Sequence, residues 1–107
     1  MPLPKKIKVG HQDYILTSES GTKILRHTDN AGGICSDADA EITWASDHPQ
    51  APKILIHEVL HAIDRHWNVF EDDVPYEKYI TSLAEGLACV MRDNPDVFKM
   101  ILKELSK

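Results

Sequence analysis

Cysteine is scarce in this chain of 107 residues: there are only two, Cys35 and Cys89, and they do not form a CxxC pair. Two cysteines at this spacing exclude a disulfide framework and offer no cysteine-based metal motif. We therefore expect both thiols to be reduced and neither to bind a metal, as is usual for a protein that stays in the cytoplasm.

Basic residues and long apolar runs are also in short supply. Twelve Lys and Arg residues stand against 17 Asp and Glu residues, which gives a net charge of −5, and the one basic cluster is the short PKKIK near the N-terminus. Nucleic acid is thus a poor candidate for a partner. No apolar stretch approaches the length of a membrane span, and no apolar run follows the basic N-terminal residues as in a signal peptide. We expect no membrane association and a location in the cytoplasm.

The pattern along the chain changes from strand-like to helical at its middle. KIKVG, DYILT, GGICS and AEITWAS are short β-type runs between residues 5 and 46. Helical periodicity follows over about 52–67, 75–92 and 95–105, with Pro52 and Pro95 in first turns and Asn94 as an N-cap. The sequence therefore predicts one α+β domain over residues 1–107, with a small, mainly antiparallel sheet followed by three helices.

The first predicted helix has one broad apolar face and one polar stripe. The polar stripe carries HEVLH, which places His57 and His61 four residues apart on the same side of the helix. The opposite arc holds Leu55, Ile56, Val59, Leu60, Ala62, Ile63 and Trp67. A helix of this kind is predicted to pack on the core and to present its histidines outward.

The HEVLH spacing suits a zinc ion. Two imidazoles at i and i+4 can both reach one Zn²⁺ ion at roughly 2.0 to 2.1 Å. Glu58 lies beside His57 but about 100° around the helix, where it can take a proton from the attacking water instead of binding the metal. The motif predicts zinc hydrolase chemistry, and the alternative interpretation is a surface helix that happens to carry histidines.

A catalytic zinc site needs a third protein ligand. Glu77 and Glu85 on the second predicted helix are candidates, and helical phase favours Glu77 because it borders the apolar face, whereas Glu85 points almost away from it. Asp64 shares the face of the two histidines and is interpreted either as a carboxylate that orients one of the metal-binding imidazoles or as a solvated aspartate. His66 points away from His57, and a structural or surface histidine is favoured over a metal ligand at this position.

HEVLHAID followed by YEKYITSLAEGLACVMRDNPDVF resembles the small phage-type zincin metallopeptidases related to the ImmA/IrrE family. The resemblance covers roughly residues 32–100. It implies a compact sheet before the HExxH helix, zinc bound by His57 and His61, Glu58 as the catalytic base, and Glu77 as the third ligand on the next helix. It also implies a phage or mobile-element protein that acts on a protein or peptide.

The predicted function is therefore hydrolysis of a peptide bond. The strand at Ile42 to Ala45 is a candidate for the sheet edge on which an extended substrate would align. Two alternatives stay open: a zinc hydrolase of a non-peptide bond, and a catalytically silent binding module with the zincin fold. Retention of Glu58 argues against the silent module, because a structural zinc site has no use for a base.

Overall fold

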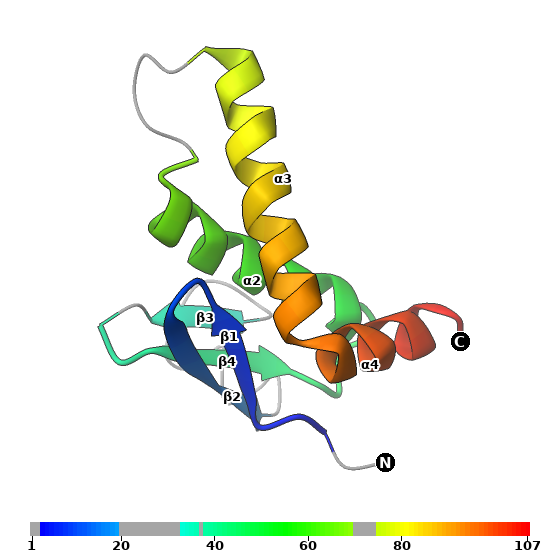
Figure 1. The fold of residues 1–107 in the computed structure, drawn as a ribbon. Coiled ribbons are helices and arrows are strands. Elements are labelled where there is room, and N and C mark those ends of the chain that lie inside the picture. The colour runs from blue at the N-terminus through cyan, green and yellow to red at the C-terminus, as the bar shows by residue number, and fades with distance from the viewer. Residues whose placement is uncertain (1–2, 20–32, 37, 70–74) are drawn as a thin grey trace.

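The computed structural model describes residues 3–19, 33–36, 38–69 and 75–107 of the chain. It has the α+β architecture that the sequence predicts, with a four-stranded mixed sheet followed by three helices (Figure 1). The elements in chain order are β1 (Lys6–Val9), β2 (Gln12–Glu19), β3 (Gly33–Ser36), β4 (Glu41–Ala45), α2 (Ala51–Trp67), α3 (Tyr76–Asp93) and α4 (Pro95–Leu105).

The strands are arranged in the order β1-β2-β4-β3. β1 and β2 form an antiparallel hairpin around Gly10, whose φ of 63° is a left-handed conformation that glycine adopts without strain. β3 and β4 are also antiparallel, but β2 and β4 run parallel, with Leu16 opposite Ile42. Two of the three pairings are thus antiparallel, as expected, and the parallel pair joins the two hairpins into one sheet.

This strand order corrects the predicted substrate edge. β4, which contains Ile42 to Ala45, is paired on one side with β2 and on the other with β3. Its backbone groups are used in the sheet, so β4 is an interior strand. Among the described strands, β3 pairs only with β4 and forms one edge of the sheet, and β1, paired only with β2, forms the other. Strand order depends on pairings between residues far apart in sequence, which the local pattern does not reveal.

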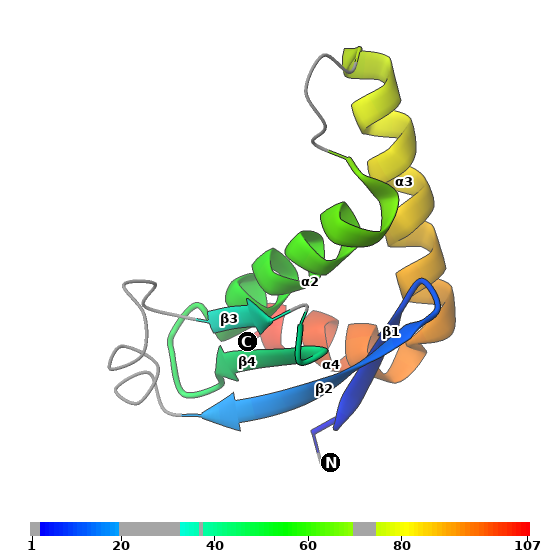
Figure 2. The ribbon, with the colours of Figure 1, turned by 90° about the vertical axis from the view of Figure 1, so that its left-hand side faces the viewer.

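One face of the sheet is buried against the helices. In β1, β2 and β4, buried residues alternate with more exposed ones, as a strand with one buried face requires. α2 contacts β1, β3 and β4, and Figure 2 shows it lying across the sheet. Its side chains Leu55, Val59, Ala62 and Ile63, from the predicted apolar arc, are among the most buried in the protein, and the strand side chains beneath are Ile7, Val9, Tyr14, Leu16, Ile42 and Trp44.

The helix α3 crosses α2 at Gly86. A Cβ atom at this position would lie 2.5 Å from Cγ2 of Ile63 and 3.1 Å from the Trp67 ring, so glycine is what allows the two helices to approach this closely. Before the crossing, α3 extends beyond the rest of the fold, as Figures 1 and 2 both show. As a result, the apolar face predicted for this helix is only partly used: Val90 is buried, but Tyr76 and Ile80 are exposed.

Asn94 joins the end of α3 to the sheet. It precedes α4 at the N-cap position, as predicted, yet its side chain makes no capping hydrogen bond. Instead its amide accepts a hydrogen bond from the Lys8 N–H at 2.7 Å and donates to the carbonyls of Lys8 at 2.7 Å and Val90 at 2.8 Å. The buried amide therefore pairs with β1 as a neighbouring strand would. Within the described residues, no helix is both long enough and apolar enough to cross a membrane.

Candidate metal centre

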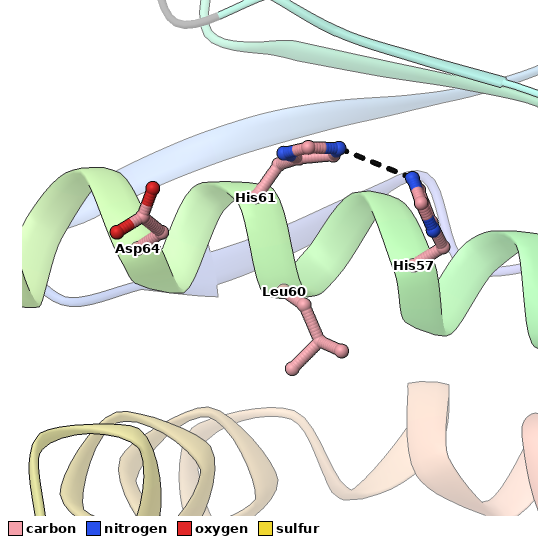
Figure 3. A pocket seen from close by; sticks show the side chains of 4 residues that line it. All are labelled: His57, Leu60, His61 and Asp64. Carbon is pink, nitrogen blue, oxygen red and sulfur yellow. Dashed lines mark hydrogen bonds between the residues drawn. The ribbon is translucent and has the colours of Figure 1, made fainter. Parts of the chain in front are cut away.

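The helix α2 presents both motif histidines to solvent. It begins at Ala51 with Pro52 in its first turn and ends at Trp67, and Asn68 follows in a left-handed conformation (φ 50°) that is typical of a helix C-terminus. Burial of its apolar side against the sheet leaves His57 and His61 exposed, one turn apart. Figure 3 shows their rings pointing toward one another above the helix.

The two imidazoles are spaced as ligands of one ion. Their Nε2 atoms lie 3.1 Å apart. Two nitrogens bound tetrahedrally to one zinc ion at 2.0 to 2.1 Å are about 3.3 Å from each other, so the observed separation fits a shared metal closely. Ligand atoms of His57, Glu58 and His61 all lie within 4.8 Å of one another. Paired imidazoles are ligands that Zn²⁺ prefers, and the carboxylate of Glu58 lies close beside them.

Glu58 differs from its neighbours because it is buried, with 5% of its surface exposed. The sequence placed it on the polar stripe of the helix, but the structure turns it toward the sheet, where it packs on Gly33 of β3. A Cβ atom on Gly33 would lie 2.8 Å from Cγ and 3.1 Å from Oε2 of Glu58, and 3.0 Å from the carbonyl oxygen of Thr43. The absence of a side chain at Gly33 thus creates the space that the glutamate occupies.

Burial raises the pKa of the Glu58 carboxyl above its ordinary value of 4.5, since the charged form loses hydration. The nearby imidazoles of His57 and His61, when protonated, act in the opposite direction and lower this pKa, but burial is the larger effect. A carboxyl group with a raised pKa is better suited to accept and return a proton near neutral pH than one in water.

A shallow depression of about 260 Å³ adjoins the histidines. It is lined by His57, Leu60, His61 and Asp64. In Figure 3, Asp64 lies one turn beyond His61 on the same side of α2, as the helical phase predicted, whereas Leu60 points to another side. Asp64 thus borders the site without belonging to the close donor cluster, and its role in orienting an imidazole stays a prediction.

The two predicted third ligands lie on α3. Glu77 is in the exposed first turn of this helix, and Glu85 is exposed farther along it. Within the described part of the chain, neither carboxylate joins the group of donors that lie within 4.8 Å of one another. The assignment of Glu77 or Glu85 as a metal ligand therefore stays a prediction.

His66 takes no part in the cluster. Its Nε2 atom lies 3.1 Å from the Tyr14 hydroxyl, and its ring packs edge-on against that of His11. These contacts join the end of α2 to the β1–β2 hairpin, which agrees with the structural one of the two roles, structural or surface, that the sequence favoured.

Sequence reasoning missed Gly33. The only signal in the sequence was the Gly-Gly pair that opens GGICS, at a point where a strand would ordinarily favour a side chain. Glycine in a strand often marks a close approach of another group, and here that group is the carboxylate of Glu58.

Comparisons of the chain with protein-family models, with curated proteins and with solved structures found no match.

Proposed function

We propose that this protein is a zinc-dependent peptidase in which His57 and His61 bind the metal and Glu58 is the general base. The observation that carries the proposal is the convergence of the two Nε2 atoms, 3.1 Å apart, beside a buried carboxylate. Histidines four residues apart are neighbours on any helix, so the feature that distinguishes this pair is the carboxylate of Glu58, whose ligand atom lies within 4.8 Å of theirs. The presence of a base next to the paired histidines favours catalysis over a purely structural metal site.

Glu58 would move the proton in this reaction. The chemistry that a bound zinc ion supplies is Lewis acidity, which activates water and polarises the scissile carbonyl group. The carboxylate oxygen of Glu58 accepts a proton from the attacking water and then delivers it to the nitrogen of the leaving amine. Contact with Gly33 holds the carboxylate in place, and the raised pKa helps it to act in both directions.

The substrate would align along β3. This strand is at the edge of the sheet among the described strands, and its first residue, Gly33, touches Glu58. An extended peptide that pairs with the outer edge of β3 would run past the base in a fixed register, with its backbone groups supplying the affinity. The proposed alignment replaces the edge at Ile42 to Ala45, which is interior.

The third ligand is proposed to come from α3, with Glu77 favoured over Glu85. The grounds are the helical phase and the family resemblance described above. Because neither carboxylate joins the donor cluster of His57, Glu58 and His61, binding by Glu77 would require the first turn of α3 to move toward α2. Zinc affinity in variants of the two residues tests this assignment separately from the rest of the site.

The direct test is metal content by mass spectrometry of the untagged protein. We expect about one zinc ion per chain, as for a mononuclear HExxH site. His61→Ala should lose the ion, Glu77→Ala should bind it more weakly, and Glu85→Ala is the matched control that should retain it. Glu58→Gln should keep the metal but lose hydrolysis of a peptide library. A folded wild type that takes up no added zinc would overturn the proposal.

A further inference from the structure

The depression beside the histidine pair has the form of a hole for one side chain. The four residues that line it stand at positions i, i+3, i+4 and i+7 of α2, and they are His57, Leu60, His61 and Asp64. Four residues with this spacing form the hole that receives a single side chain where helices pack together. The volume of about 260 Å³ is below the roughly 300–1,000 Å³ of pockets that enclose a whole small molecule. The depression therefore fits one side chain of a larger ligand.

The hole extends to the side of the histidines that faces away from β3. With His57 taken as zero, Glu58 lies at about 100° around α2, where it packs on the first residue of β3. Leu60 and Asp64 lie at about 300° and 340°, and His61 lies between the two sides at about 40°. A peptide paired with the outer edge of β3 would thus pass over the histidines, and its alternate side chains would point toward α2. One of these side chains can enter the hole beside the scissile bond.

The walls of the hole combine an apolar surface with a carboxylate. Leu60 and Asp64 are both half-buried, and Figure 3 shows Asp64 one turn beyond His61. Long basic side chains match this lining, because their aliphatic stems lie along apolar surface while the charged group reaches a polar partner. A carboxylate has about four acceptor positions, so Asp64 can accept such a group alongside its contacts within the protein. The lining thus favours lysine or arginine over an apolar side chain.

The distance from the histidine pair to Asp64 favours a long side chain. The midpoint of His57 and His61 is level with residue 59, so Asp64 lies about 7.5 Å farther along the helix axis, at 1.5 Å per residue. The four-carbon stem of lysine or the side chain of arginine can span such a gap, whereas a short polar side chain cannot. The net charge of −5 also attracts basic peptides more than acidic ones.

We propose that this hole is a specificity subsite that takes a lysine or arginine side chain of the substrate next to the scissile bond, with Asp64 as the residue that determines the specificity. The inference rests on the proposed peptidase function, because it names the substrate class of the same site. It assigns the carboxylate of Asp64 to the substrate and not to an imidazole. The two roles differ in their consequences: loss of a substrate contact changes the preference among peptides, whereas loss of an imidazole contact weakens zinc binding for every peptide alike.

The first test is cleavage of a peptide library by the zinc-loaded protein, with the cleaved bonds located by mass spectrometry. Lysine or arginine should be enriched at one position adjoining the cleaved bond. Asp64→Asn should lower kcat/KM for a lysine peptide at least about tenfold relative to the same peptide with norleucine, which lacks the ammonium group, because a charge-assisted hydrogen bond is lost. Asp13→Asn removes the same charge from an exposed position on β2, and this matched control should leave the ratio unchanged.

A binding measurement separates the subsite from the peptidase activity. In the Glu58→Gln protein, an NMR titration should shift the methyl resonances of Leu60 and give a Kd at least about tenfold lower for the lysine peptide than for the norleucine peptide. Asp64→Asn should abolish this difference. The same preference in binding without any cleavage would support the subsite and overturn the peptidase. Cleavage with no basic preference, or an Asp64→Asn variant that loses zinc and turns over all peptides equally slowly, would overturn the subsite alone. Neither binding nor cleavage would overturn both.

Discussion

The carboxylate-bearing side chain of Glu58 occupies the space that a side chain at Gly33 would fill. A Cβ atom on Gly33 would lie only 2.8 Å from Cγ of Glu58 and 3.0 Å from the backbone oxygen of Thr43. To make room for an added Cβ atom at Gly33, the Glu58 side chain would have to change rotamer. The backbone of β4 at Thr43 could not move away without disturbing the sheet. The edge strand and the proposed base are therefore mechanically coupled.

Gly33→Ala should consequently displace Glu58. We expect a loss of about 1–3 kcal/mol in the free energy of unfolding, the usual cost of overpacking a buried site. Peptidase activity should fall further than zinc content, since the histidines are untouched. Denaturant unfolding and metal analysis of the same preparation give both quantities.

A double-mutant cycle identifies the cause of that loss. Glu58→Ala removes the Cγ atom that the new methyl group would meet, so Gly33→Ala should cost less stability in this background than in the wild type. Equal costs in the two backgrounds would show that the Thr43 backbone, and not Glu58, opposes the added methyl group.

Glu58→Gln should stabilise the metal-free protein at neutral pH. The pKa of Glu58 is raised in the folded state, so the folded protein holds this proton more tightly than the unfolded chain does. The free energy of unfolding is therefore highest below the unfolded pKa of 4.5 and falls as the pH rises through the folded pKa and the buried carboxyl ionises. Glutamine carries no charge to bury and does not show this loss. Thermal unfolding in EDTA should give a higher Tm for the variant at pH 7, with the gap closing toward pH 4.5. A gap that is constant with pH would contradict the ionisation argument.

Asn94→Ala should be strongly destabilising. The buried amide makes three hydrogen bonds, two of them to the backbone of Lys8, and their loss leaves groups of β1 without partners. We expect a cost of about 2–3 kcal/mol in urea unfolding. Asp93→Ala is the neighbouring control and should cost much less, because the ion pair of Asp93 with Arg92 is exposed to solvent.

Ala40→Gly should stabilise the protein. Ala40 lies in the turn between β3 and β4 with a φ of 49°, a left-handed conformation that is strained for alanine. Glycine relieves this strain, and we expect a gain of about 1 kcal/mol in the free energy of unfolding. Ala38→Gly, in the same turn but without a positive φ, is the control and should be neutral or slightly destabilising. A higher Tm for both variants would point to a different cause.

Much of the secondary structure could be predicted because its signals are local. The expected helices 52–67, 75–92 and 95–105 agree with α2, α3 and α4 to within about one residue at each end. Prolines in the first turns and the positions of apolar residues are sufficient for this. The exposed part of α3 was not predicted, because an apolar face in the sequence does not show whether another element covers it.

The shared face of His57 and His61 follows from their spacing alone, since i and i+4 residues are neighbours on any α-helix. The burial of Glu58 on Gly33, the interior position of β4 and the edge position of β3 follow instead from the tertiary fold. Glu58 and Gly33 are 25 positions apart in the chain. Contacts at such separations depend on strand order and on how the helix is placed across the sheet, and local periodicity carries no information about either.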